Sequence, residues 1–326
     1  MADRPGVLER LLSGDVTALA RSITWAEAGD ARFRRVLSGA NERVGQAWRV
    51  GVTGPPGAGK STLVNEIIGA HRAGGRTVGV VAVDPSSPFT GGALLGDRIR
   101  MDGRSSDEGV FIRSMASRGS RGGIARATVD AVDAMDVFGL EEVLVETVGV
   151  GQAEYDVVGA ADTVLVVLCP GAGDGVQALK AGILEVADVL CVNKADLAGA
   201  ERLASDLEEA VELRAEGLRD GWVAPVVTCS AGKAEGVEQV MSALAAHKEW
   251  LEAGRLKEHR RVRRLAQIHR AVAEALDEEL WEAAGWRESA GHLLEDGKPH
   301  YDVVDELIGG LRDAQLETAK GSKEEG

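Results

Sequence analysis

Continuous apolar runs recur along the middle of the chain, separated by stretches with apolar residues at every third or fourth position. The runs predict strands at 48–53, 77–83, 110–114, 143–147, 163–168, 188–192 and 224–229. Apolar residues that follow one another without alternation are expected where helices cover both faces of a parallel sheet. Residues 47–246 are therefore predicted to form a doubly wound α/β domain with a mostly parallel sheet.

Helical patterns precede this domain. Within residues 1–46, apolar residues recur at helical spacing from Leu8 to Ile23, with a break at Gly14. Asp15 follows the break and is placed to cap a second helix. We expect this N-terminal helical segment to pack across one edge of the main domain, without a chemical role.

Residues 247–326 differ in composition, because the chain becomes charged and strongly helical from Trp250. Two apolar stripes at helical spacing consist of Val262, Leu265, Ile268, Val272, Leu276 and Leu280, and of Val303, Val304, Leu307, Ile308 and Leu311. These helices are too few for an independent core, so they should pack on the main domain, on a second copy of the chain or on another partner. Of these three we favour the homodimer. Its tail, 320–326, is expected to be disordered.

A basic run stands near the start of this extension and consists of Arg260, Arg261, Arg263 and Arg264. It has two interpretations, a solvated helix face or a contact with a partner, and the sequence leaves both open.

The first predicted strand leads into a glycine- and proline-rich turn that meets the pattern G-x-x-x-x-G-K-S. Glycines there let backbone N–H groups surround phosphate oxygens, and the following helix directs its positive end at the same phosphates. Lys60 would reach the β- and γ-phosphates, and the Ser61 hydroxyl would bind Mg²⁺. The predicted nucleotide-binding residues of this turn are Gly54, Pro55, Pro56, Gly57, Ala58, Gly59, Lys60, Ser61 and Thr62.

Carboxylates follow neighbouring strands at the same edge of the predicted sheet. Asp84 ends the second strand, Asp97 lies on the glycine-rich segment after it, and Glu146 lies near the end of the fourth strand. With Ser61 they are candidate Mg²⁺ ligands, directly or through water. The alternative for Asp84 and Asp97 is a turn or cap role. Gly149 could approach the γ-phosphate through its backbone N–H, so its loop could sense that phosphate.

The fifth strand is followed by the glycine-rich loop PGAGDGVQ. Asp174 in this loop and Lys180 after it are charged groups at the same edge. We include them as catalytic candidates together with Lys60, Asp84 and Glu146.

The tetrapeptide NKAD follows the sixth strand and separates GTPases from ATPases. The carboxylate of Asp196 can accept hydrogen bonds from the N1–H and the N2 amino group of guanine, whereas adenine offers no such pair of donors. The stem of Lys194 would lie along the nucleotide, and Asn193 would connect loops. The candidates for guanine recognition, including the SAG turn after the seventh strand, are Asn193, Lys194, Asp196, Ser230, Ala231 and Gly232.

Composition limits the classes of function. The chain has 326 residues and a net charge of −15, which argues against general nucleic-acid binding. Its cysteines, Cys169, Cys191 and Cys229, lie in apolar runs and are expected to be buried and reduced. No signal peptide and no apolar run of about 18 residues is present, so we expect a cytoplasmic protein that does not bind membranes.

With these motifs assembled, the chain resembles the GTPase chaperones of methylmalonyl-CoA mutase, the MeaB/MMAA type once labelled arginine/ornithine transport ATPases. The resemblance rests on GPPGAGKSTL, VDPSSPFTGGALLGDRIRM, SRGSRGGIA, ETVGVGQAE, PGAGDGVQALKAGILEVADV, NKAD and SAGKAEGV, in family order. It implies a homodimeric P-loop GTPase that binds GTP or GDP with Mg²⁺ and docks on an adenosylcobalamin-dependent acyl-CoA mutase. There it would gate cofactor delivery and protect the mutase from inactivation. The resemblance also implies a switch loop at 146–154 and a further switch that contains Asp174 and Lys180.

Two other classes remain as alternatives. A nickel-type metallochaperone GTPase should carry a cysteine and histidine metal site, whereas the three cysteines and six histidines here are scattered. A P-loop kinase would have no use for the NKAD tetrapeptide.

Overall fold

A computed structural model represents the protein here. It describes residues 6–84, 107–116, 123–147, 159–171, 183–215 and 221–311. Within these ranges, only the backbone is described at residues 84, 116, 123–125, 183 and 214–215.

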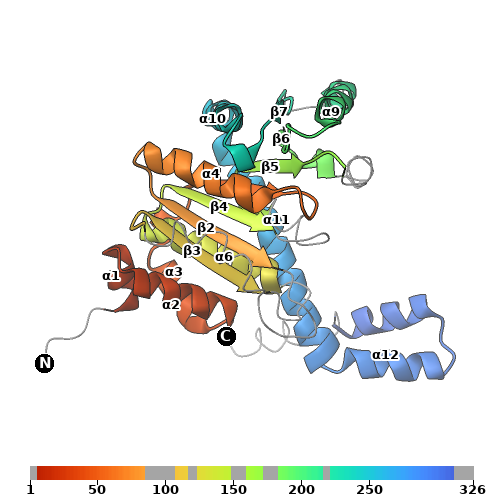
Figure 1. Ribbon diagram of the computed structural model, residues 1–326. Helices are drawn as coiled ribbons and strands as arrows, with labels where there is room; N and C mark the ends of the chain where they lie inside the picture. Colours follow the sequence, from red (N-terminus) through yellow and green to blue (C-terminus); the bar gives the residue numbers. More distant parts are fainter. Residues whose placement is uncertain are drawn as a thin grey trace, which may run out of the picture. The chain divides into compact units, whose positions relative to one another are not determined.

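The centre of the fold is a seven-stranded sheet (Figure 1), in which the order is β3-β2-β4-β1-β5-β6-β7 and every pairing is parallel. The doubly wound α/β prediction is confirmed. All seven predicted strands are present, with ends that differ from the prediction by up to two residues. In chain order they are β1 (Trp48–Thr53), β2 (Val78–Asp84), β3 (Val110–Ala116), β4 (Glu142–Thr147), β5 (Thr163–Leu168), β6 (Val189–Val192) and β7 (Val226–Thr228).

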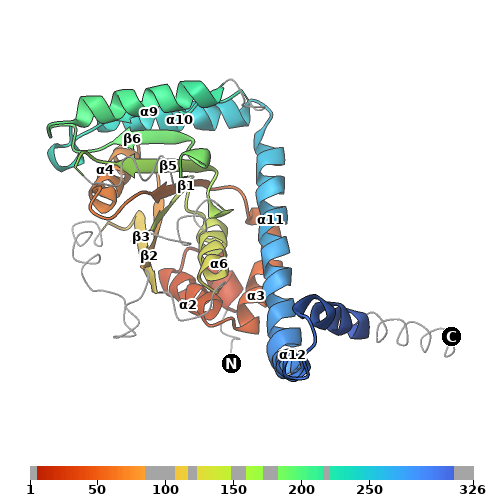
Figure 2. The same cartoon turned by 90° about the vertical axis from the view of Figure 1, so that its right-hand side faces the viewer.

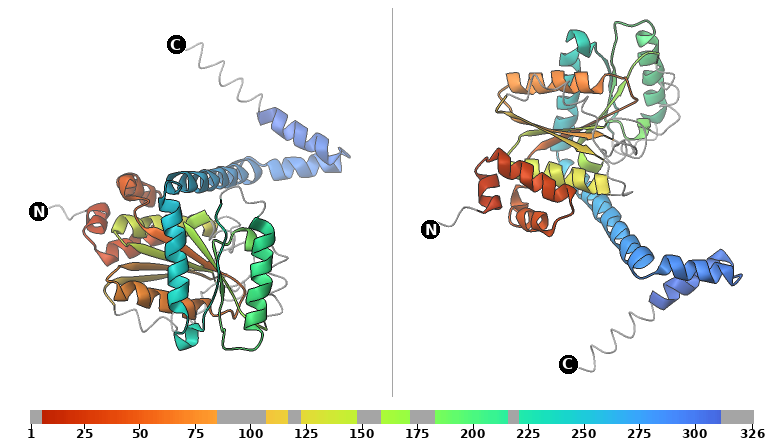
Figure 3. Two further views of the ribbon diagram at one scale, coloured as in Figure 1. Left: turned by 90° about the horizontal axis from the view of Figure 1, so that it is seen from above. Right: turned by 60° about the horizontal axis from the view of Figure 1, so that its bottom comes forward.

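Helices cover both faces of the sheet, which explains the continuous apolar runs. On β4, Leu144 packs in a core with α4 (Lys60–Ala73) and α10 (Val237–Glu252). Its neighbours Val143 and Val145 face the opposite core, which α6 (Gly123–Phe138) and the N-terminal helices complete. Figure 3 shows the strands between α4 on one side and α6 on the other. On the α6 face, α9 (Ala200–Ala215) covers β5 and β6.

The N-terminal segment forms α1 (Val7–Leu12), α2 (Val16–Glu27) and α3 (Ala31–Ser38), which lie beside α6 (Figure 2). The predicted cap is present, because the Asp15 carboxylate accepts from the N–H groups of Thr17 at 2.8 Å and Ala18 at 3.2 Å. At the edge strand β3, Arg113 donates to Glu27 at 2.5 Å. The segment thus packs on α6 and reaches the β3 edge of the sheet.

The chain divides into two compact units, Met1–Gln267 and Ile268–Gly326. In the second unit, the end of α11 (Leu256–Leu276) is followed by a π-helical turn (Asp277–Ala283), α12 (Trp286–Glu295) and a helix over 300–311.

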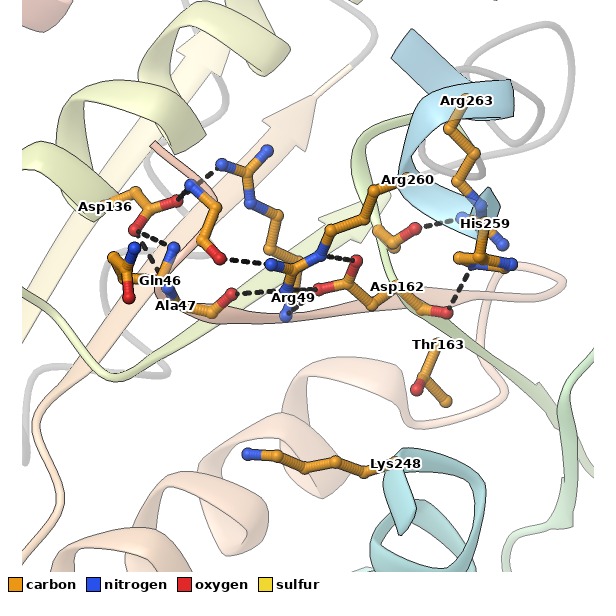
Figure 4. A network of polar contacts seen from close by, with 12 residues as sticks. Gln46, Ala47, Arg49, Asp136, Asp162, Thr163, Lys248, His259, Arg260 and Arg263 are labelled. Atoms are coloured by element: carbon orange, nitrogen blue, oxygen red, sulfur yellow. Dashed lines mark hydrogen bonds and ion pairs between the residues drawn. The ribbon is translucent and has the colours of Figure 1, made fainter. Parts of the chain in front are cut away.

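The first turns of α11 are bound to the beginnings of β1 and β5 (Figure 4). Arg260 donates to both carboxylate oxygens of Asp162, from Nε at 2.7 Å and from Nη2 at 2.6 Å. The same guanidinium donates to the carbonyls of Ala47, at 2.9 Å, and of Gly45. Because the Asp162 side chain is only 3% exposed, this is a buried ion pair that ties the helix to the sheet.

Two more arginines of the basic run have acidic partners in the same unit. Arg264 lies 3.0 Å from Asp133, and Arg263 lies 3.8 Å from Asp188. Arg261 pairs with Glu258 at the surface. Arg260, Arg263 and Arg264 thus pair with acids of the same unit, which neither interpretation anticipated, whereas the exposed Arg261 fits a solvated helix face. A contact of this run with a partner stays a prediction.

Arg49 of β1 belongs to the same network, because Asp133 pairs with both Arg49 and Arg264. Its guanidinium lies 2.8 Å from Asp133 and 2.7 Å from Asp136, and all three side chains are nearly inaccessible. Asp136 also accepts from the backbone N–H groups of residues 45–47, so it fixes the chain that enters β1.

His247 of α10 is buried beside the start of β5. Its Nδ1 lies 2.9 Å from the Thr163 hydroxyl, and its Nε2 lies 3.5 Å from the Asp188 carboxylate. The rings of Trp222 and Trp250 pack against the imidazole. Burial lowers the pKa of His247 to about 3 and raises the pKa of Asp188 to about 6.

Candidate functional site

The loop between β1 and α4 has the backbone that the glycine pattern requires. Gly54 has a φ of 135°, and a Cβ placed there would lie 2.0 Å from the carbonyl oxygen of Val167. Gly59 has a φ of 89°, and its Cβ would lie 2.4 Å from the amide nitrogen of Asn193. Both positions therefore exclude any side chain, and the loop packs directly on the ends of β5 and β6.

Lys60 begins α4 and turns back over this loop. Its ammonium donates to the carbonyls of Gly54 at 2.7 Å and Pro55 at 3.1 Å, and the residue is 6% exposed. A buried ammonium at a helix N-terminus, surrounded by a glycine-rich loop, is a site for phosphate oxygens. The loop therefore has the geometry of a phosphate-binding site.

Ser61 and Glu146 meet beside Lys60. The Ser61 hydroxyl donates to the Glu146 carboxylate at 2.5 Å, although the two residues come from α4 and β4. Glu146 is 1% exposed and stands next to Val52 in the register of β4 and β1. A hydroxyl and a carboxylate in contact are hard oxygen ligands that suit Mg²⁺, with phosphate oxygens and water completing its shell.

The loop after β6 lies against the phosphate-binding loop. The Asn193 side chain donates to the Ala58 carbonyl at 2.8 Å and accepts from the Ala231 N–H at 3.0 Å. Lys194 has a positive φ of 59° and donates from Nζ to the Gly57 carbonyl at 2.8 Å. The two loops therefore form one continuous polar surface.

Asp196 and the SAG turn lie together at the other end of this surface. The Ser230 hydroxyl donates to the Asp196 carboxylate at 3.1 Å and accepts from its backbone N–H at 3.2 Å. The Asp196 side chain is 31% exposed, so it is accessible to a base.

Lys233 is a residue of this region that the sequence analysis missed. Its ammonium lies 3.0 Å from Asp196, and this hydrogen bond lowers the pKa of that carboxyl. The turn at Ala231–Lys233 returns the lysine to the carboxylate. The only signal in the sequence was a lysine directly after the SAG triplet. Asp196 is ionised at neutral pH, the form that guanine requires, and the pairing favours that form further.

The structure brings together the phosphate-loop residues, Ser61, Glu146 and the two base-recognition segments at the carboxyl ends of β1, β4, β6 and β7. Asp84 ends β2 beside them, but its side chain is not among those described. Four predicted site residues lie outside the described residues, and their roles stay predictions: Asp97, Gly149, Asp174 and Lys180.

Two further observations concern the described residues alone. None of their helices is long and apolar enough to cross a membrane. No group of three or more histidine, cysteine, aspartate or glutamate side chains among them is arranged to hold a metal ion. All three cysteines are buried and free, as expected, and the sulfurs of Cys191 and Cys229 lie 3.3 Å apart.

Comparison with known proteins agrees with this geometry. The chain is 49% identical over 269 residues to a protein of Pyrococcus abyssi, covering 82% of this chain and 83% of that protein. It is 34% identical over 247 residues to the methylmalonic aciduria type A homolog of Mus musculus, covering 71% of this chain and 59% of that protein.

A crystal structure titled as an LAO/AO transport system kinase has the same fold. Its TM-score is 0.73 at 26% sequence identity, and the match covers 94% of this chain and 96% of that one. Residues 19–285 match the family described as methylmalonyl Co-A mutase-associated GTPase MeaB. The chain therefore belongs to the MeaB family, and it is a P-loop GTPase.

Proposed function

We propose that this GTPase is a chaperone that docks on an adenosylcobalamin-dependent acyl-CoA mutase of the methylmalonyl-CoA mutase type. Its nucleotide cycle gates delivery of the cofactor to the mutase and protects the mutase from inactivation. The observation that carries the proposal is a site with a phosphate loop at one end and an ionised guanine acceptor at the other, in a chain of the MeaB family.

Each part of the site has a role in GTP hydrolysis. Lys60 and the loop N–H groups hold the β- and γ-phosphates, while the Asp196 carboxylate binds the guanine edge. Ser61 and Glu146 would hold Mg²⁺, which would neutralise charge on the phosphates. Without an arginine that contacts the transferred phosphoryl group, such sites hydrolyse GTP at about 10⁻⁴ s⁻¹, and with one supplied by the same chain at about 10⁻² s⁻¹. We therefore expect slow turnover by the protein alone.

The decisive experiment measures GTP turnover with and without purified methylmalonyl-CoA mutase, in the presence of Mg²⁺. We expect the mutase to accelerate turnover, and the Asp196→Asn variant to lose the stimulated rate with GTP. The same protein should change the rate at which adenosylcobalamin enters the apo-mutase, with GTP and GDP giving different rates. Identical GTPase rates with and without mutase, together with unchanged cofactor loading, would refute the chaperone role.

A homodimer is the second part of the proposal. One face of α11 presents an apolar stripe in which each residue is 47–54% exposed, formed by Val262, Leu265, Ile268, Val272 and Leu276. Exposed apolar stripes of this kind bury their surface against a partner helix. We expect Val272→Asp to give a monomer in light scattering, whereas Glu274→Gln, on the side of the helix opposite the stripe, should leave the oligomeric state unchanged. A wild-type monomer at 50 μM would contradict this assignment.

A further inference from the structure

A second pocket lies at the opposite end of the sheet from the nucleotide loops. It has a volume of about 390 Å³ and is lined by the beginnings of β1 and β4, the last turn of α4 and the middle of α10. His71 in its wall is 11 residues beyond Lys60 on α4, which corresponds to about 16 Å along the helix. The pocket is therefore separate from the phosphate loop, although both of its flanking helices begin next to nucleotide-binding loops.

Most of this pocket is apolar. Val50, Met241, Leu244 and the indole of Trp48 form its wall. Trp48 and Val50 are almost fully buried. Clefts of this size, with an apolar wall and a few convergent polar groups, are typical binding sites for small molecules.

The polar groups of the pocket converge on one buried carboxylate. Glu142 is 4% exposed at its side chain and lies 2.6 Å from the Arg76 guanidinium and 3.6 Å from the Lys248 ammonium. Lys248 also lies over the Trp48 ring, 5.0 Å from its centre. Within the described lining, two cations face one carboxylate, so the lining itself carries one positive charge in excess. The exposed carboxylate of Glu141 is not part of the lining but acts on His71 from outside it.

His71 adds no charge at neutral pH. Burial lowers its pKa to about 4; Arg76 and Lys248 act in the same direction, and Glu141 acts weakly against them. The imidazole is therefore neutral at pH 7 and can donate or accept one hydrogen bond in the wall of the pocket.

We propose that this pocket binds a small monocarboxylate with an apolar body. The ligand carboxylate would take the surplus positive charge of Arg76 and Lys248, and its body would lie against Trp48 and Leu244. A cationic ligand is disfavoured because two cations already line the pocket. A phosphate dianion is disfavoured because only one positive charge is in excess and Glu142 is adjacent.

The test is calorimetric titration of the full chain with 1-naphthoate, with saturating GDP present so that the nucleotide site is filled. A neutral analogue, 1-naphthalenemethanol, has the same body without the charge. Ala245→Trp fills the pocket from an exposed position on α10, and Ala246→Trp is its matched control, since Ala246 is exposed on the same helix but does not line the pocket. Lys248→Met removes the ammonium but keeps the stem.

We expect millimolar or tighter binding of naphthoate to the wild type and to Ala246→Trp. Ala245→Trp and Lys248→Met should each weaken it at least tenfold, and the neutral analogue should bind at least tenfold more weakly than naphthoate. No binding at 10 mM naphthoate would overturn the proposal. Equal affinity in Ala245→Trp and the wild type would overturn the location, and equal affinity for the neutral analogue would overturn the role of charge.

Discussion

Replacement of Arg260 by methionine tests the network that binds α11 to the sheet. The substitution keeps an apolar stem of similar length but removes the charge that faces Asp162. The carboxylate of Asp162 is 3% exposed, so it would stay buried, with the Arg49 backbone N–H at 3.1 Å as a remaining donor. The guanidinium groups of Arg49 and Arg263 would still attract it electrostatically. Hydrogen bonds to the carbonyls of Ala47 and Gly45 would be lost as well.

The structure sets the expected magnitude. Removing one partner of a buried ion pair costs about 3–5 kcal/mol, because the other charge is left buried. Since the Arg260 side chain is 26% exposed, water can partly replace it. We therefore expect a loss of stability at the lower end of this range, about 3 kcal/mol. For a large domain this corresponds to a fall in Tm of about 6–12 °C.

The assay is urea denaturation at one fixed protein concentration, followed by circular dichroism. Arg261→Met is the matched control, because Arg261 and its partner Glu258 are 62% and 63% exposed, and its loss should cost under about 0.5 kcal/mol. Asp162→Asn added to Arg260→Met should restore at least half of the lost stability, since the buried charge is removed. If Arg260→Met and Arg261→Met were equally stable, the buried-pair argument would fail.

Three further outcomes are expected. Lys60→Ala should abolish GTP binding in calorimetry, because the phosphates lose their buried ammonium; submicromolar affinity in the variant would contradict this role. Asp196→Asn should shift preference from guanine to xanthine nucleotides in competition assays, and an unchanged preference would remove the base assignment. His247→Gln should make the loss of stability between pH 6.5 and 4 shallower, by at most about 1.4 kcal/mol per pH unit. The pKa of His247 is about 3 in the folded protein and near 6.5 in the unfolded chain, so stability present at neutral pH is lost as protons bind the unfolded chain. If the urea midpoints of the two proteins changed equally steeply across this pH range, the assignment would be refuted.

Much of the fold followed from the sequence because a parallel sheet covered on both faces needs unbroken apolar strands. The existence of each strand was therefore predicted correctly, whereas strand ends shifted by one or two residues. In β2 and β4 the shift arises because the polar residues Asp84 and Glu142 still pair in the sheet. At the edge, β7 is only Val226–Thr228, shorter than its apolar run. The third N-terminal helix was not singled out, because among its side chains only Phe33 is buried.

The charged network could not have been predicted in the same way. Arg260 pairs with Asp162, 98 residues away, and Arg49 pairs with Asp136, 87 residues away. A run of arginines gives no indication of its partners, because only the folded topology brings these acids to the start of β1 and β5. Lys233 was missed for a related reason: its position depends on a turn of three residues rather than on a periodic pattern.

Asn193 contacts the phosphate loop through its amide nitrogen and the SAG turn through its amide oxygen. This side chain is 2% exposed, and it holds the phosphate loop and the SAG turn at a fixed separation. Little conformational freedom remains for this part of the protein to lose on association. We therefore expect GTP and GDP to bind the same arrangement of these two segments, so that exchange of one nucleotide for the other does not require the segments to rearrange.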